Sequence, residues 1–266
     1  MQHKQIQLTE GNIHYWVVGK ERAPLIIFTH GATATHTMFS EQVEFFSRDY
    51  RVVVWDMPAH GMSRPFSRFL LSVSTEGLLK MIDLESYLGN AHLVGQSAGG
   101  YAAQLAAIND PDKVISLTMI GSTPLGGEMV SRIDKALLMM TPFLLKLYPS
   151  EHLKDIIAKS VSCTDQARAD MRESLNALSK QEIAGIMDGV YKGVLSARDP
   201  QFNCPLLITF GEFDRTGKVA AYSRRWAEQT LSPLVVIPAA SHNANLDNPG
   251  FFNQTLMDFL GSLKPD

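Results

Sequence analysis

Apolar runs of strand length, each bounded by turn residues, recur along the chain and predict eight strands. Six of the runs are almost continuously apolar, at 25–29, 51–56, 91–95, 114–120, 205–211 and 234–238. Strands that are apolar on both faces belong in a parallel sheet that is covered on both sides. Two earlier runs, 6–9 and 13–19, are joined by Glu10-Gly11-Asn12 and predict an antiparallel hairpin.

Helical patterns lie between most of these strands. They occupy 38–46, 75–88, 98–108, 219–229 and 251–263. Strands and helices that alternate in this way form a doubly wound α/β fold, in which ligands gather at the carboxyl ends of the strands. Any functional site is therefore expected on the loops that follow the strands.

One long segment interrupts the alternation. Between residues 120 and 204 no strand pattern occurs, and the segment predicts helices at about 128–147, 151–160, 165–178 and 180–194. An excursion of this size between two core strands is typical of a helical cap. We therefore expect a core made of 1–121 and 204–266, with a cap of 122–203 inserted over one end of the sheet.

Composition and charge exclude several other classes of protein. The 266 residues are 45% hydrophobic and 19% charged, with a net charge of −3 and no basic stripe, which argues against a nucleic-acid partner. No secretory signal is visible, and the longest apolar-rich stretch, 136–148, is too short to span a membrane. The two cysteines, Cys163 and Cys204, show no metal-binding spacing. The sequence thus predicts a cytoplasmic protein with no metal and no organic cofactor.

The stretch LVGQSAGGYAAQLA at 93–106 places one hydroxyl among very small residues. Its Gly95-Gln96-Ser97-Ala98-Gly99 segment matches G-x-S-x-G at the turn from a strand into a helix. Small residues at such a turn allow strand and helix to pack closely, and they leave the serine hydroxyl exposed. Ser97 is therefore the candidate nucleophile, and an incidental serine in a glycine-rich turn is the alternative.

A serine hydroxyl needs a base, because its own pKa is too high for attack at neutral pH. Sites of this kind order their residues along the chain as Ser, acid, His. His242 follows the strand at 234–238 and is the predicted base. Two of the other histidines, His30 and His60, each precede a glycine and are interpreted as loop-shaping residues.

The acid should lie on a loop between Ser97 and His242. Asp214 directly follows the strand at 205–211 and is the predicted carboxylate, with Glu212 as the local competitor. Asp247 is near His242 in sequence and is expected to open the last helix.

Two backbone N–H groups are predicted to stabilise an oxyanion at this site. One belongs to Ala98, the residue after the nucleophile. The other belongs to Ala32, on the loop THGATATH that follows the strand at 25–29.

With these motifs in order, the sequence resembles the α/β-hydrolase superfamily over most of its length. Besides the serine turn, it carries HGA at 30–32, DMPAHGMS at 56–63, GEFD at 211–214 and SHN at 241–243. Ala59 stands where the family commonly has glycine. The resemblance implies a mostly parallel eight-stranded sheet with helices on both faces and an inserted cap. It also implies the chemistry of carboxylesterases, lactonases, thioesterases or hydrolases of C–C bonds in ring-cleavage products.

The first predicted cap helix is rich in leucine and methionine. Its apolar residues are Met129, Leu137, Leu138, Met139, Met140, Phe143, Leu144 and Leu147. Met139, Met140 and Phe143 are the expected walls of an apolar substrate pocket, and ordinary packing on the core is the alternative. The sequence shows no cation that must meet a charged substrate, and leaves open a role for the three arginines Arg64, Arg132 and Arg215.

Two functions of different classes follow from the sequence. The first is a serine hydrolase of a small or medium, mainly apolar ester, lactone or thioester, with a C–C bond hydrolase as its alternative. The second is a ligand-binding, receptor-like protein that keeps the fold without useful turnover. The partner is a small ester-like molecule in the first case, and the oligomeric state stays open, with a homodimer as one alternative.

Overall fold

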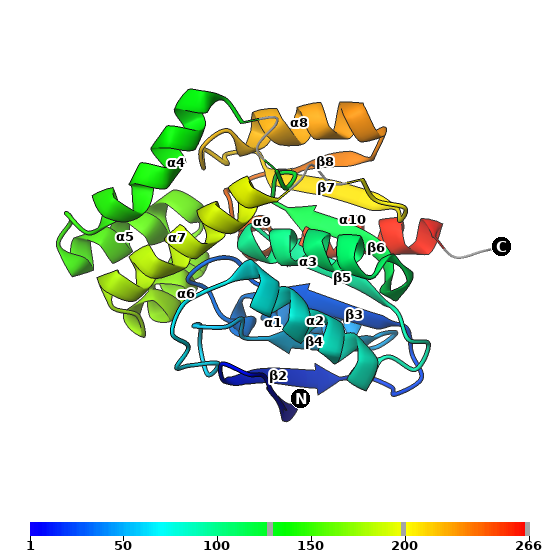
Figure 1. The fold of residues 1–266 in the computed structure, drawn as a ribbon. Coiled ribbons are helices and arrows are strands. Elements are labelled where there is room, and N and C mark those ends of the chain that lie inside the picture. The colour runs from blue at the N-terminus through cyan, green and yellow to red at the C-terminus, as the bar shows by residue number, and fades with distance from the viewer. Residues whose placement is uncertain (127–129, 198–200, 264–266) are drawn as a thin grey trace.

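A single sheet of eight strands runs through the computed structural model, which describes residues 1–126, 130–197 and 201–263 (Figure 1). The strands are β1 (Gln2–Gln7), β2 (Asn12–Val18), β3 (Leu25–Thr29), β4 (Arg51–Trp55), β5 (Ala91–Gln96), β6 (Val114–Ile120), β7 (Leu206–Gly211) and β8 (Leu234–Ile237). Their order in the sheet is β1-β2-β4-β3-β5-β6-β7-β8.

The strand directions confirm the predicted hairpin and the predicted parallel sheet. β1 and β2 pair antiparallel, and β2 runs antiparallel to β4. From β4 to β8 every pair is parallel, with Ile27 of β3 opposite Val53 of β4 on one side and Leu93 of β5 on the other. The carboxyl ends of these six strands therefore meet at one edge.

Burial explains the continuous apolar runs. Every residue of β3, β4 and β5 is buried, and the large side chains of Phe28 and Trp55 are completely enclosed. The Trp55 Nε1–H donates to Thr29 Oγ1 at 3.0 Å, so its polar edge is satisfied inside the core. A strand with solvent on one face would instead alternate apolar and polar residues.

Helices cover both faces of the sheet, as the resemblance implied. They are α1 (Ser40–Phe46), α2 (Leu71–Glu85), α3 (Ala98–Asn109), α8 (Val219–Thr230), α9 (Ala244–Asp247) and α10 (Pro249–Ser262), with short 3₁₀ helices at His36–Phe39 and Pro111–Lys113. α2 and α3 pack on each other in front of the sheet in Figure 1, and α10 lies behind it and contacts α1.

Four helices lie between β6 and β7 and form a separate group beside the sheet (Figure 1). They are α4 (Arg132–Leu145), α5 (Ser150–Val161), α6 (Asp165–Asn176) and α7 (Lys180–Ser196). Ser131, Thr164 and Ser179 accept backbone N–H groups at the starts of α4, α6 and α7, so local capping sets where these helices begin.

The observed helix boundaries bear on two of the expectations for this segment. The predicted helix at 128–147 begins later, at Arg132, and its residues 128 and 129 lie outside the described residues. The cap limits 122–203 stay a prediction.

The longest helix, α7, has 17 residues, and within the described chain no helix has the length and apolar character needed to cross a membrane.

Candidate active site

Ser97 occupies a strained turn between β5 and α3. Its φ and ψ are 47° and −113°, a conformation that L-residues rarely adopt, and its N–H is held by the Ile120 carbonyl at 2.9 Å. A Cβ added at Gly95 would collide with the backbone of Gly100, and one added at Gly99 with the Thr29 carbonyl oxygen. The small residues around Ser97 are therefore required by close backbone approach.

The two predicted oxyanion donors lie at the start of α3 and on the loop after β3. Ala98 is the first residue of α3, where N–H groups have no partner inside the helix and the helix dipole favours negative charge. Ala32 follows β3 and lines the same cavity as Ser97. Within the described part of the chain, neither N–H has a hydrogen-bond acceptor, so both are available to a ligand.

Two buried histidines hold the loop that carries Ala32. The Met57 N–H donates to His30 Nε2 at 2.9 Å, and the Thr33 N–H donates to His60 Nε2 at 3.0 Å. Each ring accepts at Nε2 and donates from Nδ1 to a backbone carbonyl, so both rings are neutral. Burial lowers the pKa of His30 to about 4 and that of His60 to about 3.

We predict that these histidines make the fold sensitive to acid. In the unfolded chain they take up protons near pH 6.5, whereas the folded protein resists protonation until the pH approaches 4. The free energy of unfolding should therefore fall between pH 6.5 and 4, by up to about 1.4 kcal/mol per pH unit for each ring.

Chemical denaturation of His60→Gln at several pH values measures this effect. The glutamine amide keeps an acceptor for Thr33 but does not titrate, so the fall in stability should be shallower than in the wild type. His152→Gln, at an exposed position on α5, is the matched control. Equal pH slopes for the wild type and His60→Gln would contradict the prediction.

His242 and Asp214 form a buried hydrogen-bonded pair. His242 Nδ1 lies 2.8 Å from Asp214 Oδ2, and the Asp214 side chain is fully enclosed. Its other oxygen accepts the Thr216 N–H at 2.8 Å. Burial acts to raise the pKa of Asp214, but the charge and hydrogen bond of His242 and the bond from Thr216 outweigh it and hold the pKa below its ordinary value. The carboxylate is therefore ionised and orients the ring.

The competing carboxylate has a different partner. Glu212 is exposed, and its Oε2 accepts the Ala239 N–H at 3.0 Å. Asp214 and not Glu212 is therefore the carboxylate that the structure brings to His242.

Gln96 connects His242 to the loop that carries Ala32, a contact that the sequence analysis did not predict. Its Nε2 donates to the His242 carbonyl at 3.2 Å. A Cβ added at Gly31 would collide with Gln96 Oε1, so the glycine before Ala32 makes room for this side chain. The position of Gln96, directly before Ser97 at a strand end, is the one signal that pointed to it.

Asp247 has a role that differs from the expected one. It ends α9, whereas α10 begins at Pro249, so the expectation that it opens the last helix is wrong. Its carboxylate accepts the N–H groups of Ser241 at 2.8 Å and Thr164 at 2.9 Å. Asp247 thereby ties the loop that carries His242 to the start of α6.

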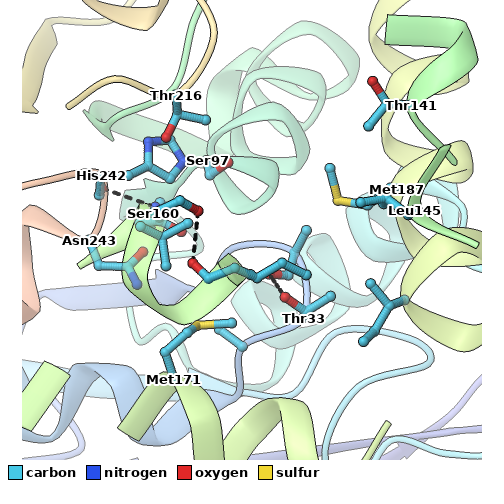
Figure 2. A pocket seen from close by; sticks show the side chains of 16 residues that line it. Thr33, Ser97, Thr141, Leu145, Ser160, Met171, Met187, Thr216, His242 and Asn243 are labelled. Carbon is cyan, nitrogen blue, oxygen red and sulfur yellow. Dashed lines mark hydrogen bonds between the residues drawn. The ribbon is translucent and has the colours of Figure 1, made fainter. Parts of the chain in front are cut away.

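A cavity of about 190 Å3 adjoins Ser97 and is lined on one side by residues of the four helices α4–α7 (Figure 2). Ser97 and His242 both face it, together with the loop residues Thr33 and Thr216. The helices contribute Thr141, Leu145, Ile157, Ser160, Val161, Met171, Ile183 and Met187. This lining is mainly apolar on the helix side, with several hydroxyl groups and the amides of Gln96 and Asn243, and within the described residues it contains no lysine or arginine.

The structure corrects the predicted pocket walls. Met139, Met140 and Phe143 point away from the cavity, with 44%, 52% and 64% of their surfaces exposed. Thr141 and Leu145, one helical turn apart, face the cavity instead. α4 is apolar around most of its circumference, so its residue pattern does not indicate which face turns inward.

Metal ligands are not gathered at this site. Across the described ranges, no three His, Cys, Asp or Glu side chains are grouped so that they could hold a metal ion. The groups that face Ser97 are instead a hydrogen-bonded imidazole and backbone N–H donors, the arrangement that supports nucleophilic attack and oxyanion stabilisation.

A nucleophile turn, a histidine–carboxylate pair and two N–H donors at the strand ends of such a sheet are the features of an α/β hydrolase. The chain belongs to the alpha/beta hydrolase family, whose model matches residues 26–255.

The chain is similar to proteins with several different activities. The chain is 25% identical to 3-oxoadipate enol-lactonase 1 of Acinetobacter baylyi, over 92% of each chain. It is 27% identical to a 2-hydroxy-6-oxononadienedioate/2-hydroxy-6-oxononatrienedioate hydrolase of Pseudomonas putida, over 93% of this chain and 91% of the relative. A thermophilic esterase from Thermogutta terrifontis has the same fold, with a TM-score of 0.80 and 19% identity over the full length of both chains.

Proposed function

We propose that the protein is a serine hydrolase that cleaves carboxylic esters with small to medium, uncharged acyl groups. The observation that carries this proposal is the His242–Asp214 pair, which faces the same cavity as Ser97. A carboxylate that orients a histidine next to a strained serine has the chemistry needed for acyl transfer.

In the proposed reaction, Ser97 Oγ attacks the ester carbonyl while His242 Nε2 takes its proton. Asp214 holds the ring through Nδ1 and stabilises the imidazolium that forms. The N–H groups of Ala32 and Ala98 bind the oxyanion. Collapse of this intermediate breaks the bond to the leaving group, which takes the proton from His242. Water then attacks the acyl-enzyme by the same route and releases the acid.

The lining of the cavity supports an uncharged acyl group. The names of the two relatives contain oxoadipate and oxononadienedioate, both of which are dicarboxylates. A buried carboxylate needs a cation or several hydrogen-bond donors. No lysine or arginine of the described chain lines this cavity, whereas leucine, isoleucine, valine and methionine do. A hydrolase of ring-cleavage diacids is therefore the second candidate, favoured by the similarity to the Pseudomonas relative alone.

We further propose that α4–α7 act as a cap that selects the acyl group, since eight of the lining residues come from these helices. Met187→Ala on α7 should raise the ratio of kcat/KM for octanoate esters to that for acetate esters by about tenfold. The smaller side chain enlarges the apolar cavity and makes room for a longer acyl chain. Met140→Ala on α4 is the matched control, since its side chain is exposed and the ratio should not change. Two superimposable profiles of kcat/KM against chain length would reject Met187 as a pocket wall.

Reaction with a fluorophosphonate probe tests the proposal as a whole. A hydrolase of this kind should be labelled covalently at Ser97 and should lose esterase activity in step with labelling. A receptor-like protein would bind esters without turnover. Absence of both labelling and ester turnover in the folded protein would reject the proposed function.

A further inference from the structure

A second cleft, of about 440 Å3, adjoins the catalytic cavity and is cationic. Three of its lining side chains are Lys159, Arg168 and Arg215. Ser160 and Thr216 line both the cleft and the catalytic cavity, so these two side chains form the boundary between them.

Most of the positive charge in the cleft is not neutralised by the protein. Neither Lys159 nor Arg215 is paired with a carboxylate among the described residues, and both are exposed. Arg168 is held in place, with Nε donating to the Ser162 carbonyl at 3.0 Å and Nη1 lying 3.3 Å from Asp165.

The carboxylate of Asp247 lies close to the cleft but is not one of its lining groups. Its two oxygens are occupied by donors from Cys163, Thr164 and Ser241. Among the described residues, the lining of the cleft therefore contains three cationic side chains and no acidic one.

The cleft lies on the His242 side of the cavity, where the proposed mechanism places the leaving group. His242 returns its proton to the leaving group, so that group is next to the ring when the ester bond breaks. Thr216 is bonded through its N–H to Asp214, and Ser241, which also lines the cleft, directly precedes His242. Figure 2 shows Thr216 and Ser160 on the His242 side of the cavity, with Met187 and Leu145 across from them.

We propose that Lys159 and Arg215 bind a negative charge carried by the leaving group, so that the preferred substrate joins an uncharged acyl group to an anionic alcohol or thiol. This inference rests on the proposed function. The ester bond breaks with its electron pair moving to the leaving oxygen or sulfur, which takes the proton from His242. The anionic group on the far part of the leaving group stays charged and lies against the two cations.

A pair of aryl esters tests the cleft directly. 4-Butyryloxybenzenesulfonate carries a fixed negative charge on its leaving group, and 4-butyryloxybenzenesulfonamide is its neutral counterpart of similar size. We expect kcat/KM of the wild type to be roughly tenfold higher for the sulfonate, as for one or two partly exposed ion pairs. The preference should appear mainly in KM and should weaken as salt is added.

Two double variants separate a local site from the general field of the protein. In Lys159→Gln/Arg215→Gln the sulfonate-to-sulfonamide ratio should fall to about one. Lys20→Gln/Arg48→Gln removes the same charge from exposed positions on other loops and should keep the wild-type ratio.

The outcomes are distinct. A ratio near one in the wild type, or a ratio that survives in Lys159→Gln/Arg215→Gln, would overturn the cationic subsite while ester hydrolysis stands. Equal losses in both double variants would also overturn it, since the effect would then be non-local. If neither ester is hydrolysed, the proposed function itself fails.

Discussion

Replacing Ser97 by alanine is expected to lower kcat on a 4-nitrophenyl ester by about 10⁴- to 10⁶-fold while leaving the fold intact. The substitution removes only Oγ, the atom that would form the acyl-enzyme. Alanine is chosen over glycine because the backbone at this position is held at a φ of 47°. Glycine would relieve that strain and change the stability together with the chemistry.

Steady-state kinetics and the thermal midpoint of both proteins measure the effect. The variant should also fail to react with a fluorophosphonate, and its circular dichroism should match that of the wild type. Near-normal turnover by a well-folded Ser97→Ala protein would show that another group is the nucleophile.

Asp214→Asn is expected to lower kcat by about 10⁴-fold, the second largest effect. The amide is nearly the same size as the carboxylate, but it loses the charge that stabilises the imidazolium. It can also present an N–H to His242 Nδ1, which would leave the proton on Nε2 and remove the base from the side that faces Ser97.

Glu212→Gln is the matched control, because it makes the same chemical change two residues away. Glu212 is exposed and bonds the Ala239 N–H, so its loss should change kcat by less than about threefold. If Glu212→Gln lost activity and Asp214→Asn did not, the acid would be Glu212. The assignment of the fold would still stand.

The sequence predicted the parts of the molecule that depend on local pattern. β3 and β4 are apolar on both faces because both faces are covered, and that burial is visible as a continuous run. Ser97, Asp214 and His242 each lie on the turn or loop that follows a parallel strand, so the shared direction of those strands brings them to one edge. The order of strands and loops along the chain is therefore enough to predict that these three residues lie at the same edge of the sheet.

Other parts depend on contacts that the sequence does not record. β1 begins at Gln2, although the apolar pattern predicted a start at Ile6, because its polar residues are held by pairing with β2. The inward face of α4 is set by packing on α7, and an all-round apolar helix does not reveal it. Gln96 contacts His242 and Asp247 contacts Thr164, partners far away in the chain that the local sequence pattern does not reveal.

The sheet order has a consequence for how the protein becomes active as it folds. Ser97 and both N–H donors belong to the first half of the chain, whereas His242 follows β8, an edge strand that pairs only with β7. On the proposed mechanism, a nascent chain folded as far as β6 would hold the nucleophile without its base and would be inactive. We expect activity only after β8 has paired with β7. Recovery of esterase activity during refolding would therefore report edge-strand pairing, a later event than collapse of the core.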